Sequence, residues 1–416
     1  MNYFQYVNNE LYAEGVSIRE IVSQVGTPLY IYSQKTLERH FRAYDSAFGD
    51  IDHLICFAVK ANSSLAVLNL LAGLGAGADI VSGGELYRAL KAGIQPEGIV
   101  YAGVGKTRQE MEAALRAGIL LFNVESWSEL EFLNQVAGEL GLVAPVAWRV
   151  NPDIAADTHP YISTGLKKEK FGLDIHHALE EYKRAKVFKN VELAGIHVHI
   201  GSQITQVSPF VDSLIKVADL IKKLDAEGIK IRFIDIGGGL GITYKDEVPP
   251  SPQEFLQAIS PVISGLGVRI ISEPGRVIVG NAGILVTQVL YVKEKDDKNF
   301  LIVDAGMNDL IRPSLYKAYH EILPVRKEDR PKVVADVVGP ICESGDFLAR
   351  DRELSEFRPG ELMATMSAGA YGFTMSSNYN SRPRVAEVLV RGDQFSLIRE
   401  RETYGDLTRG EKVPTW

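Results

Sequence analysis

The feature that most constrains the fold is a long alternation of strand-like and helix-like segments between residues 33 and 275. Short apolar runs typical of buried strands recur there, and each is followed by a segment with helical periodicity. The predicted strands are 51–59, 78–81, 98–102, 120–124, 145–150, 193–200, 231–236 and 268–273. Eight strands alternating with helices are the pattern of a (β/α)8 TIM barrel, so we predict this fold for 33–275.

The predicted helices carry their own start signals. In a capping box a Ser or Thr caps the helix and a Glu three residues later reaches back to it. The predicted boxes are Ser82 with Glu85, Thr107 with Glu110, Ser126 with Glu129 and Ser251 with Glu254. Before the first barrel strand, a helix is predicted from Gln34, because large apolar residues follow it at helical spacing. They are Leu37, Phe41, Tyr44 and Phe48.

After Gly275 the alternation stops and the pattern becomes mainly β. The predicted strands there are 277–293, 300–304, 332–338, 361–366 and 385–398. Further short strands within 1–32 have no place in the barrel count. We therefore predict a second, all-β domain, sandwich-like or barrel-like, made of 1–32 and 276–416. The long irregular stretch 151–174 is predicted to be a functional or mobile loop.

Composition excludes several classes of protein. A net charge of −8 argues against a nucleic-acid partner or an anionic membrane surface. No apolar run reaches the ~20 residues that span a bilayer. The two cysteines form no disulfide framework and fit a reducing compartment. We expect a cytoplasmic protein without membrane or nucleic-acid partners.

Polar or glycine residues close at least six of the predicted barrel strands. TIM barrels assemble their active sites at this end of the strands, so these residues define a candidate site. They are Lys60, Asp79, Arg149, His199, Gly237 to Gly239, and Glu273. Each one alone has an ordinary explanation, such as a solvated strand end, whereas a whole rim of them is hard to explain by solvation.

The two-residue side-chain period of a strand sorts these residues by face. If Lys60 points inward, so does Cys56, which then fills the barrel. His197 and His199 share a face, and His199 lies nearer the rim. From the residues alone, His199 is a base, a stacking surface or a metal ligand; we predict no metal, because no His or Cys at zinc-ligand spacing accompanies it.

The glycine triplet 237–239 is either a tight turn or an anion cradle, since glycines let backbone N–H groups approach a phosphate. Arg276 supplies a fixed cation nearby in the sequence. A lysine, a carboxylate, a flat histidine and a phosphate cradle together suit pyridoxal phosphate. That cofactor needs a lysine for covalent attachment, and a carboxylate such as Glu273 would keep its ring nitrogen protonated.

In the β region, Cys342 is followed by Glu-Ser-Gly-Asp, which is a poor core sequence. Its thiol is either buried filler or an acid that protonates a carbanion. Arg312 is either a carboxylate clamp or a surface ion-pair partner. Tyr371 places a further polar group in apolar surroundings.

With these motifs, the chain resembles the diaminopimelate decarboxylases, of the alanine racemase/ornithine decarboxylase fold group, over nearly its whole length. The motifs that carry the resemblance are Phe57 to Asn62, His197 to Gln203, Gly237 to Gly239, Glu273 to Arg276, Arg312 to Tyr316 and Cys342 to Asp346. The resemblance implies decarboxylation of meso-2,6-diaminopimelate to L-lysine and carbon dioxide, with pyridoxal 5'-phosphate as the cofactor.

The resemblance also implies residue roles. Lys60 and Cys342 would be catalytic, with Lys60 holding the cofactor and Cys342 donating the proton after decarboxylation. The implied cofactor-binding residues are Lys60, Asp79, Arg149, His199, Ser202, Gly238, Gly239, Glu273, Pro274, Gly275, Arg276 and Tyr371. The implied substrate-binding residues are Arg276, Arg312, Tyr316, Glu343 and Tyr371. The family's active site lies at a homodimer interface, so Cys342 and Glu343 would come from the partner subunit.

The substrate assignment has a physical argument beside the resemblance. The far end of diaminopimelate carries a carboxylate and an ammonium, which suit two arginines and Glu343 respectively. The alternatives are a related decarboxylase for another basic amino acid or a carboxylated polyamine, and a non-catalytic homologue that binds pyridoxal phosphate. A racemase would need a second base where the chain has Cys342.

Overall fold

The computed structural model describes residues 2–154, 172–295 and 298–416. The chain divides into two compact units. The barrel unit comprises His40–Thr243 and Glu247–Val277, and the β unit comprises Met1–Arg39, Tyr244–Asp246 and Ile278–Trp416. The sequence-based domain bounds at 32/33 and 275/276 stay predictions. The proposed loop 151–174 lies largely outside the described residues.

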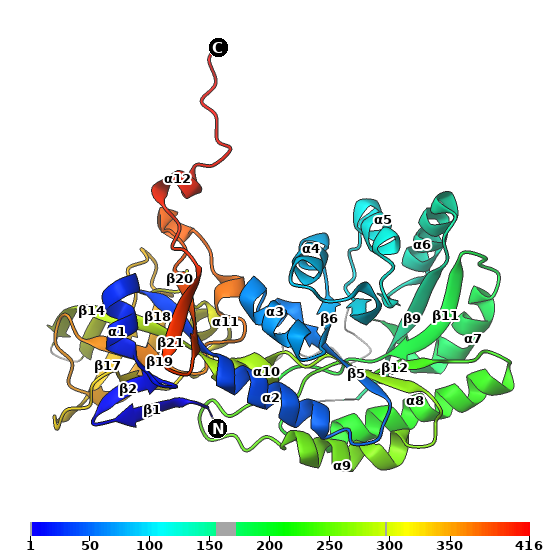
Figure 1. Cartoon of the computed structure of the whole chain (residues 1–416), viewed down its shortest axis with the longest axis horizontal. Helices are drawn as coiled ribbons and strands as arrows, with labels where there is room; N and C mark the ends of the chain where they lie inside the picture. The colour runs from blue at the N-terminus through cyan, green and yellow to red at the C-terminus, as the bar shows by residue number, and fades with distance from the viewer. Residues whose placement is uncertain (1, 155–171, 296–297) are drawn as a thin grey trace. The chain divides into compact units, whose positions relative to one another are not determined.

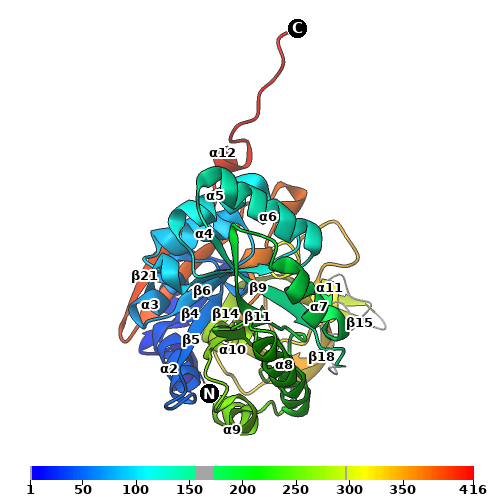
Figure 2. The same cartoon turned by 90° about the vertical axis from the view of Figure 1, so that its right-hand side faces the viewer.

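Eight parallel strands of the barrel unit form a closed sheet, which confirms the predicted TIM barrel (Figure 2). In hydrogen-bonded order they are β5 (His53–Ala58), β6 (Gly77–Ile80), β7 (Ile99–Tyr101), β8 (Leu121–Val124), β9 (Ala144–Asn151), β11 (Val191–His197), β12 (Phe233–Asp235) and β13 (Arg269–Ser272). Pairing of β13 with β5 closes the ring. A two-residue strand, β10 (Leu173–Asp174), pairs with the end of β9.

Helices surround these strands, as Figure 2 shows. They are α2 (Gln34–Ser46), α3 (Leu65–Gly73), α4 (Gly83–Lys91), α5 (Arg108–Ala117), α6 (Trp127–Leu140), α7 (Ile175–Ala185), α8 (Ser208–Ala226) and α9 (Pro252–Ile263). The predicted capping boxes at Thr107 and Ser251 are complete. Ser82 and Ser126 also cap their helices, but there the glutamate accepts from the N–H one residue upstream of the cap.

Apolar side chains fill the barrel interior, so it is a packed core rather than a channel. One buried cluster draws residues from seven strands: Cys56, Val100, Leu121, Ala147, Ala194, Phe233 and Ile271. Cys56 is fully buried, as its predicted filling role requires. Burial is the largest factor that raises the pKa of the Cys56 thiol well above its usual value, and the carboxylate of Asp235 raises it further. The thiol is therefore unreactive.

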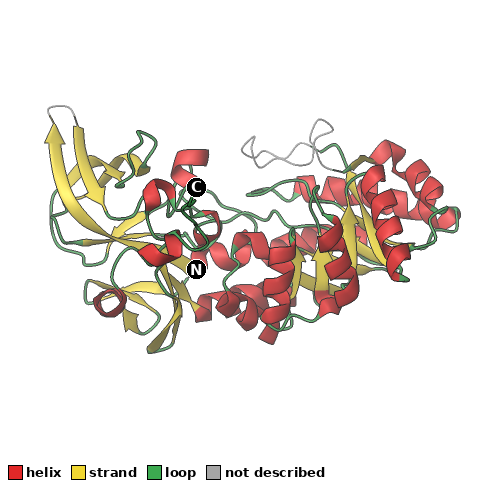
Figure 3. Ribbon diagram, turned by 90° about the horizontal axis from the view of Figure 1, so that it is seen from above, coloured by secondary structure: helices red, strands yellow, loops and turns green. Residues whose placement is uncertain are grey.

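The β unit is built on mixed sheets that include the N-terminal strands, as predicted (Figure 1). Figure 3 shows the strands of the chain in yellow. Its main sheet has the order β18 (Phe347–Ser355), β17 (Lys332–Val338), β15 (Lys298–Val303), β14 (Gly283–Lys295), β4 (Leu29–Ser33), β20 (Ala386–Arg391) and β21 (Gln394–Arg399). Strand β19 (Leu362–Thr365) also pairs with β14, and strand β16 (Ile322–Pro324) pairs with β19. A separate sheet consists of β1 (Phe4–Val7), β2 (Glu10–Ala13) and β3 (Val16–Ser17). The short helices of this unit are α1 (Ile18–Val25), α11 (Arg312–Tyr316) and α12 (Tyr404–Leu407). Helix α10 (Arg276–Val279) spans the point in the sequence where the barrel unit ends at Val277 and the β unit resumes.

Strand β4 lies inside the main sheet because both of its faces are apolar. Leu29 and Ile31 pack in one buried cluster, whereas Tyr30 and Tyr32 pack in another on the opposite face. This N-terminal strand pairs with β14 on one side and β20 on the other. The first residues of the chain are therefore an integral part of the β unit.

Two predicted strands in the β region are wrong in detail, and the strand β18 was missed. The strand predicted from 277 begins at Gly283, because 276–279 form helix α10 despite their β-branched residues. The single strand predicted over 385–398 is the hairpin β20–β21, turned at Gly392 with φ +61°. β18 was not predicted, because its middle residues are charged and largely exposed. Among the helices of the described residues, none is both long and apolar enough to cross a bilayer.

Candidate active site

The barrel rim brings the predicted lysine onto a buried carboxylate. Lys60 lies in a short 3-10 helix (Val59–Ala61) directly after β5, and Asp79 lies on β6. Nζ of Lys60 donates to the Asp79 carboxylate; the lysine side chain is 35% exposed and the aspartate side chain is fully buried. Burial raises the pKa of Asp79 to about 7, and Glu273 contributes in the same direction, against the opposing charge of Lys60. A partly exposed lysine side chain is thus fixed at the rim.

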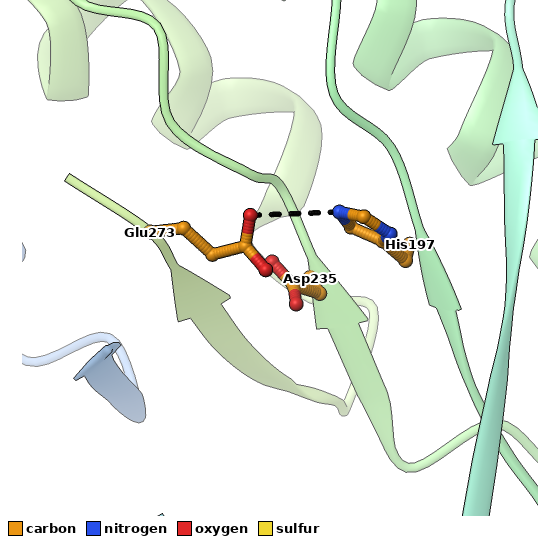
Figure 4. Close-up of side chains that lie close together, drawn as sticks. All are labelled: His197, Asp235 and Glu273. Carbon is orange, nitrogen blue, oxygen red and sulfur yellow. Dashed lines mark ion pairs between the residues drawn. The ribbon is translucent and has the colours of Figure 1, made fainter. Parts of the chain in front are cut away.

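Beside this pair, three buried side chains from adjacent strand ends face one another. Figure 4 shows His197 from β11, Asp235 from β12 and Glu273 from the end of β13, with Nε2 of His197 3.6 Å from the Glu273 carboxylate. Nδ2 of Asn123, on β8, donates to Asp235 at 2.9 Å and to Glu273 at 3.4 Å. Four strands therefore contribute to one polar network in the barrel unit.

Within this network the two carboxyl groups have opposite tendencies. Burial and the neighbouring Glu273 raise the pKa of Asp235 well above its usual value. Burial alone would raise the pKa of Glu273 too, but His197 and Lys60 outweigh it and hold that pKa below its usual range. These opposite shifts favour proton binding at Asp235 and ionisation at Glu273, so Glu273 is the better partner for a cationic group.

His199 presents a neutral ring at the rim. It follows β11 by two residues, is half-buried, and its Nδ1 accepts from the backbone N–H of Gly238 at 3.2 Å. Burial lowers the pKa of His199 well below its usual value, and the charges of Arg149 and Lys60 add to that effect. Because Nδ1 accepts, the single proton of the neutral ring is on Nε2. The predicted stacking role fits this neutral, flat side chain.

Arg149 is held by an acid that the sequence did not single out. Its Nη1 donates to Oε1 of Glu125 at 2.8 Å, and both side chains are buried. The other carboxylate oxygen of Glu125 accepts from the N–H of Gly172 at 2.9 Å. This pairing fixes Arg149 among the residues that neighbour His199.

The glycine triplet allows backbone segments to approach closely. A Cβ on Gly238 would lie 2.2 Å from the carbonyl oxygen of Glu273, and one on Gly239 would lie 2.5 Å from that of Gly201. Gly237 and Gly239 also have φ of +65° and +115°, which favour glycine. The glycines are therefore required by close backbone packing, whereas the tight turn and the anion cradle at Gly238 and Gly239 both stay predictions.

The predicted phosphate-binding groups after β13 lie next to those after β11. Nη2 of Arg276 donates to Oγ of Ser202 at 2.9 Å. The carbonyl oxygen of Pro274 accepts from the N–H of Ala58 at 3.1 Å, which ties this segment to β5. At Gly275 a Cβ would lie 2.9 Å from the Cβ of Ala61, so only glycine fits there without a shift.

In the β unit, the predicted thiol lies on an ordered surface loop. Cys342 and Glu343 are exposed, and the N–H of Cys342 donates to Oδ1 of Asn380 at 2.8 Å. The buried carboxylate of Asp346 accepts from the N–H groups of Met307 and Ile341, each at 2.7 Å. The polar sequence after Cys342 therefore builds a fixed loop that leaves the thiol accessible, which overturns the alternative of buried filler.

The other predicted substrate-binding residues belong to the β unit as well. Arg312 begins α11 and is buried, which excludes the surface ion-pair alternative. Its Nη1 lies 2.7 Å from Nε2 of His320. Tyr316 ends α11 and is half-buried; Tyr371 is half-buried with φ +55°.

The structure thus brings the rim residues of the barrel unit together, and their assigned roles stay predictions. Sequence reasoning missed the supporting residues Asn123, Glu125, Asp235 and His320. Asp235 has a recognisable signal, because it ends a strand directly before the glycine triplet. The others act through partners that only the folded chain brings close, so no local pattern identifies them.

Comparison with known proteins supports the family resemblance that the sequence motifs indicate. Residues 34–280 match the family model described as "Pyridoxal-dependent decarboxylase, pyridoxal binding domain". The chain is 56% identical to the diaminopimelate decarboxylase of Aquifex aeolicus over 97% of this chain and 96% of that one. It is 53% identical to that of Haemophilus influenzae over 98% of both chains.

A solved structure has the same fold. The chain is similar to the structure of diaminopimelate decarboxylase from Helicobacter pylori complexed with L-lysine, with a TM-score of 0.91 and 46% identity. The match covers 94% of this chain and 98% of that one. Family match, identity and fold agree over nearly the full length, and the chain therefore belongs to the diaminopimelate decarboxylase family of pyridoxal-dependent decarboxylases.

Proposed function

We propose that this protein decarboxylates meso-2,6-diaminopimelate to L-lysine and carbon dioxide, the last step of lysine biosynthesis, with pyridoxal phosphate as cofactor. The observation that carries the proposal is the partly exposed Lys60 side chain paired with buried Asp79, at the same barrel rim as Glu273, in a chain of this family. The lysine-bound structure of the Helicobacter pylori relative supports the identity of the product.

The rim residues fit this cofactor chemically. Lys60 would hold it covalently, the neutral ring of His199 would stack on its pyridine ring, and the Glu273 carboxylate would face its ring nitrogen. Ser202, Gly238, Gly239 and Arg276 would hold the phosphate. When bound, pyridoxal phosphate supplies an electron sink for the electron pair left at Cα as the C–CO2 bond breaks.

The remaining steps would fall to residues of the β unit. Arg312 and Tyr316, with Arg276 of the barrel unit, would bind the carboxylate at the far end of the substrate, and Glu343 would bind the ammonium there. Once carbon dioxide has left, the Cys342 thiol would give its proton to Cα. The exposure of Cys342 on a fixed loop supports a role outside the core.

We further propose a homodimer in which the partner subunit supplies Cys342 and Glu343 to each site. Both side chains are exposed in the isolated chain, as this arrangement requires. A cytoplasmic location is proposed as well, because the reaction serves amino-acid biosynthesis and Cys56 and Cys342 are both free.

Turnover assays test the proposal. The purified chain with added pyridoxal phosphate would receive meso-diaminopimelate, and arginine, ornithine and lysine in parallel, with Lys60→Ala as the inactive control. Equal amounts of lysine and carbon dioxide from diaminopimelate alone are expected. Turnover of another amino acid would overturn the substrate assignment, and no turnover of any would overturn the enzymatic function.

A further inference from the structure

A buried histidine of the β unit stands between Arg312 and the protein backbone. His320 is fully buried, and neither the sequence motifs nor the proposed mechanism gives it a role. Its Nε2 lies 2.7 Å from Nη1 of Arg312, and its Nδ1 lies 2.8 Å from the carbonyl oxygen of Met366. Both ring nitrogens therefore have short, specific contacts.

The two contacts determine the protonation of the ring. A carbonyl oxygen can only accept, so Nδ1 of His320 must carry a hydrogen and donate it to Met366. A guanidinium can only donate, so Nε2 must be the bare acceptor for Arg312. His320 is thus a neutral imidazole of one defined tautomer, anchored on one side and directing Arg312 on the other.

Tyr244 restrains the same guanidinium from another direction. The Arg312 guanidinium carbon lies 4.5 Å from the centre of the Tyr244 ring. The Tyr244 and His320 rings are 5.3 Å apart and nearly perpendicular, at 76°. A hydrogen bond along one N–H and a cation–π contact together fix both the position and the orientation of the guanidinium.

We propose that His320 is a positioning residue that makes the site selective for ligands with a distal carboxylate, by holding Arg312 in the orientation such a carboxylate needs. The inference rests on the proposed function, in which Arg312 binds that carboxylate. Recognition of a carboxylate by a guanidinium depends strongly on geometry, so an arginine with a free side chain would discriminate poorly.

Two variants separate this role from simple packing. His320→Asn places an amide near the Nδ1 position, keeping the bond to Met366 and losing the acceptor for Arg312. His320→Gln reaches the Nε2 position and offers an oxygen to Arg312. The ligands compared are L-lysine, which keeps the distal carboxylate, and 1,5-diaminopentane, which lacks it while presenting the same amine to the cofactor.

Binding to the holoenzyme is measured by calorimetry. His320→Asn should raise the Kd of L-lysine about 10-fold or more, the effect expected for a hydrogen bond to a charged group. The Kd of 1,5-diaminopentane should stay the same within about 2-fold, because this ligand has no distal carboxylate for Arg312 to bind. In turnover of meso-diaminopimelate, KM should rise with little change in kcat. The Gln variant should recover most of the lysine affinity.

Other results of the same measurements would contradict the proposal. Equal weakening of both ligands by His320→Asn, or no weakening of either, would overturn the proposal. Absence of meso-diaminopimelate turnover by the wild-type chain would reject the proposed function instead. The Kd values of L-lysine and 1,5-diaminopentane would still test the role of His320. If the Asn variant does not fold, the wild-type tautomer is read by ¹⁵N NMR, with His320→Gln for assignment. A hydrogen on Nε2 would then reject the proposal.

Discussion

Lys60 and Asp79 form an ion pair whose two ends have very different surroundings. The lysine side chain is 35% exposed, whereas the aspartate side chain is completely buried under it. A carboxylate buried away from solvent depends on a cation or a proton for its stability. The same pair that fixes the reactive amine therefore also makes the barrel unit sensitive to pH.

The first prediction concerns stability of the cofactor-free chain. The folded-state pKa of Asp79 is about 7, far above the ~3.9 of an unfolded chain. Between these values the unfolded chain has released a proton that the folded chain retains, so the free energy of unfolding falls as pH rises. The free energy of unfolding of Asp79→Asn should not fall in this way. Between pH 5 and 7 it should therefore rise by about 2 kcal/mol relative to that of wild type.

Urea unfolding at several pH values measures this difference. Asp50→Asn is the matched control, because Asp50 is exposed and its replacement should leave the pH profile unchanged. Wild type and Asp79→Asn with parallel profiles would show that burial of Asp79 does not govern stability in this range.

The barrel was predictable because its strands are buried on both faces and read as apolar runs, with capped helices between them. The β unit was harder. β18 has exposed charged residues in its middle, so its pairing with β17 outweighs its composition. In 276–279, three β-branched residues form α10, which shows tertiary packing overriding local propensity.

For the site, sequence reasoning found residues whose chemistry is unusual at a strand end, such as Lys60 and Glu273. It did not find their supports. Asn123 lies 150 positions from Glu273, and the donation that joins them exists only because the barrel closes. His320 follows Arg312 by eight residues but lies beyond the end of α11 at Tyr316, so the path of the chain after that helix sets the pair.

Replacing Glu273 by glutamine should abolish most catalysis. A neutral amide cannot keep the ring nitrogen of the bound cofactor protonated, so the electron sink weakens. We expect kcat to fall by about 100-fold or more, within the range seen when one electrostatic group is removed from an active site. Steady-state decarboxylation rates measure this, with visible absorbance reporting cofactor content.

Glu254→Gln is its control, because Glu254 is an exposed capping residue on α9 and its exchange should leave kcat unchanged. Wild-type turnover by Glu273→Gln would remove Glu273 from the mechanism.

Replacing the two cysteines should have opposite effects on turnover. Cys342→Ala should keep the cofactor bound and lose about 100-fold or more in kcat, since general acids contribute factors of 10² to 10⁴. Cys56→Ala should keep its turnover, because Cys56 only fills the barrel interior. Parallel kcat and absorbance measurements compare them. Undiminished turnover by Cys342→Ala would exclude its thiol as the proton donor.

Mixing two inactive chains tests the shared active site. Lys60→Ala should lose the visible band of the covalently held cofactor, whereas Lys91→Ala, at an exposed position, should keep it. If each site combines Lys60 of one chain with Cys342 of its partner, a mixed dimer of Lys60→Ala and Cys342→Ala has one site with both residues intact.

With random exchange half of the dimers are mixed, and each has one intact site of two, so activity should recover to about a quarter of wild type. Activity is measured before and after subunit exchange, and two tags of different mass confirm that mixed dimers form. Mixed dimers without recovered activity would mean that Lys60 and Cys342 act within the same chain, because such a dimer then has no intact site.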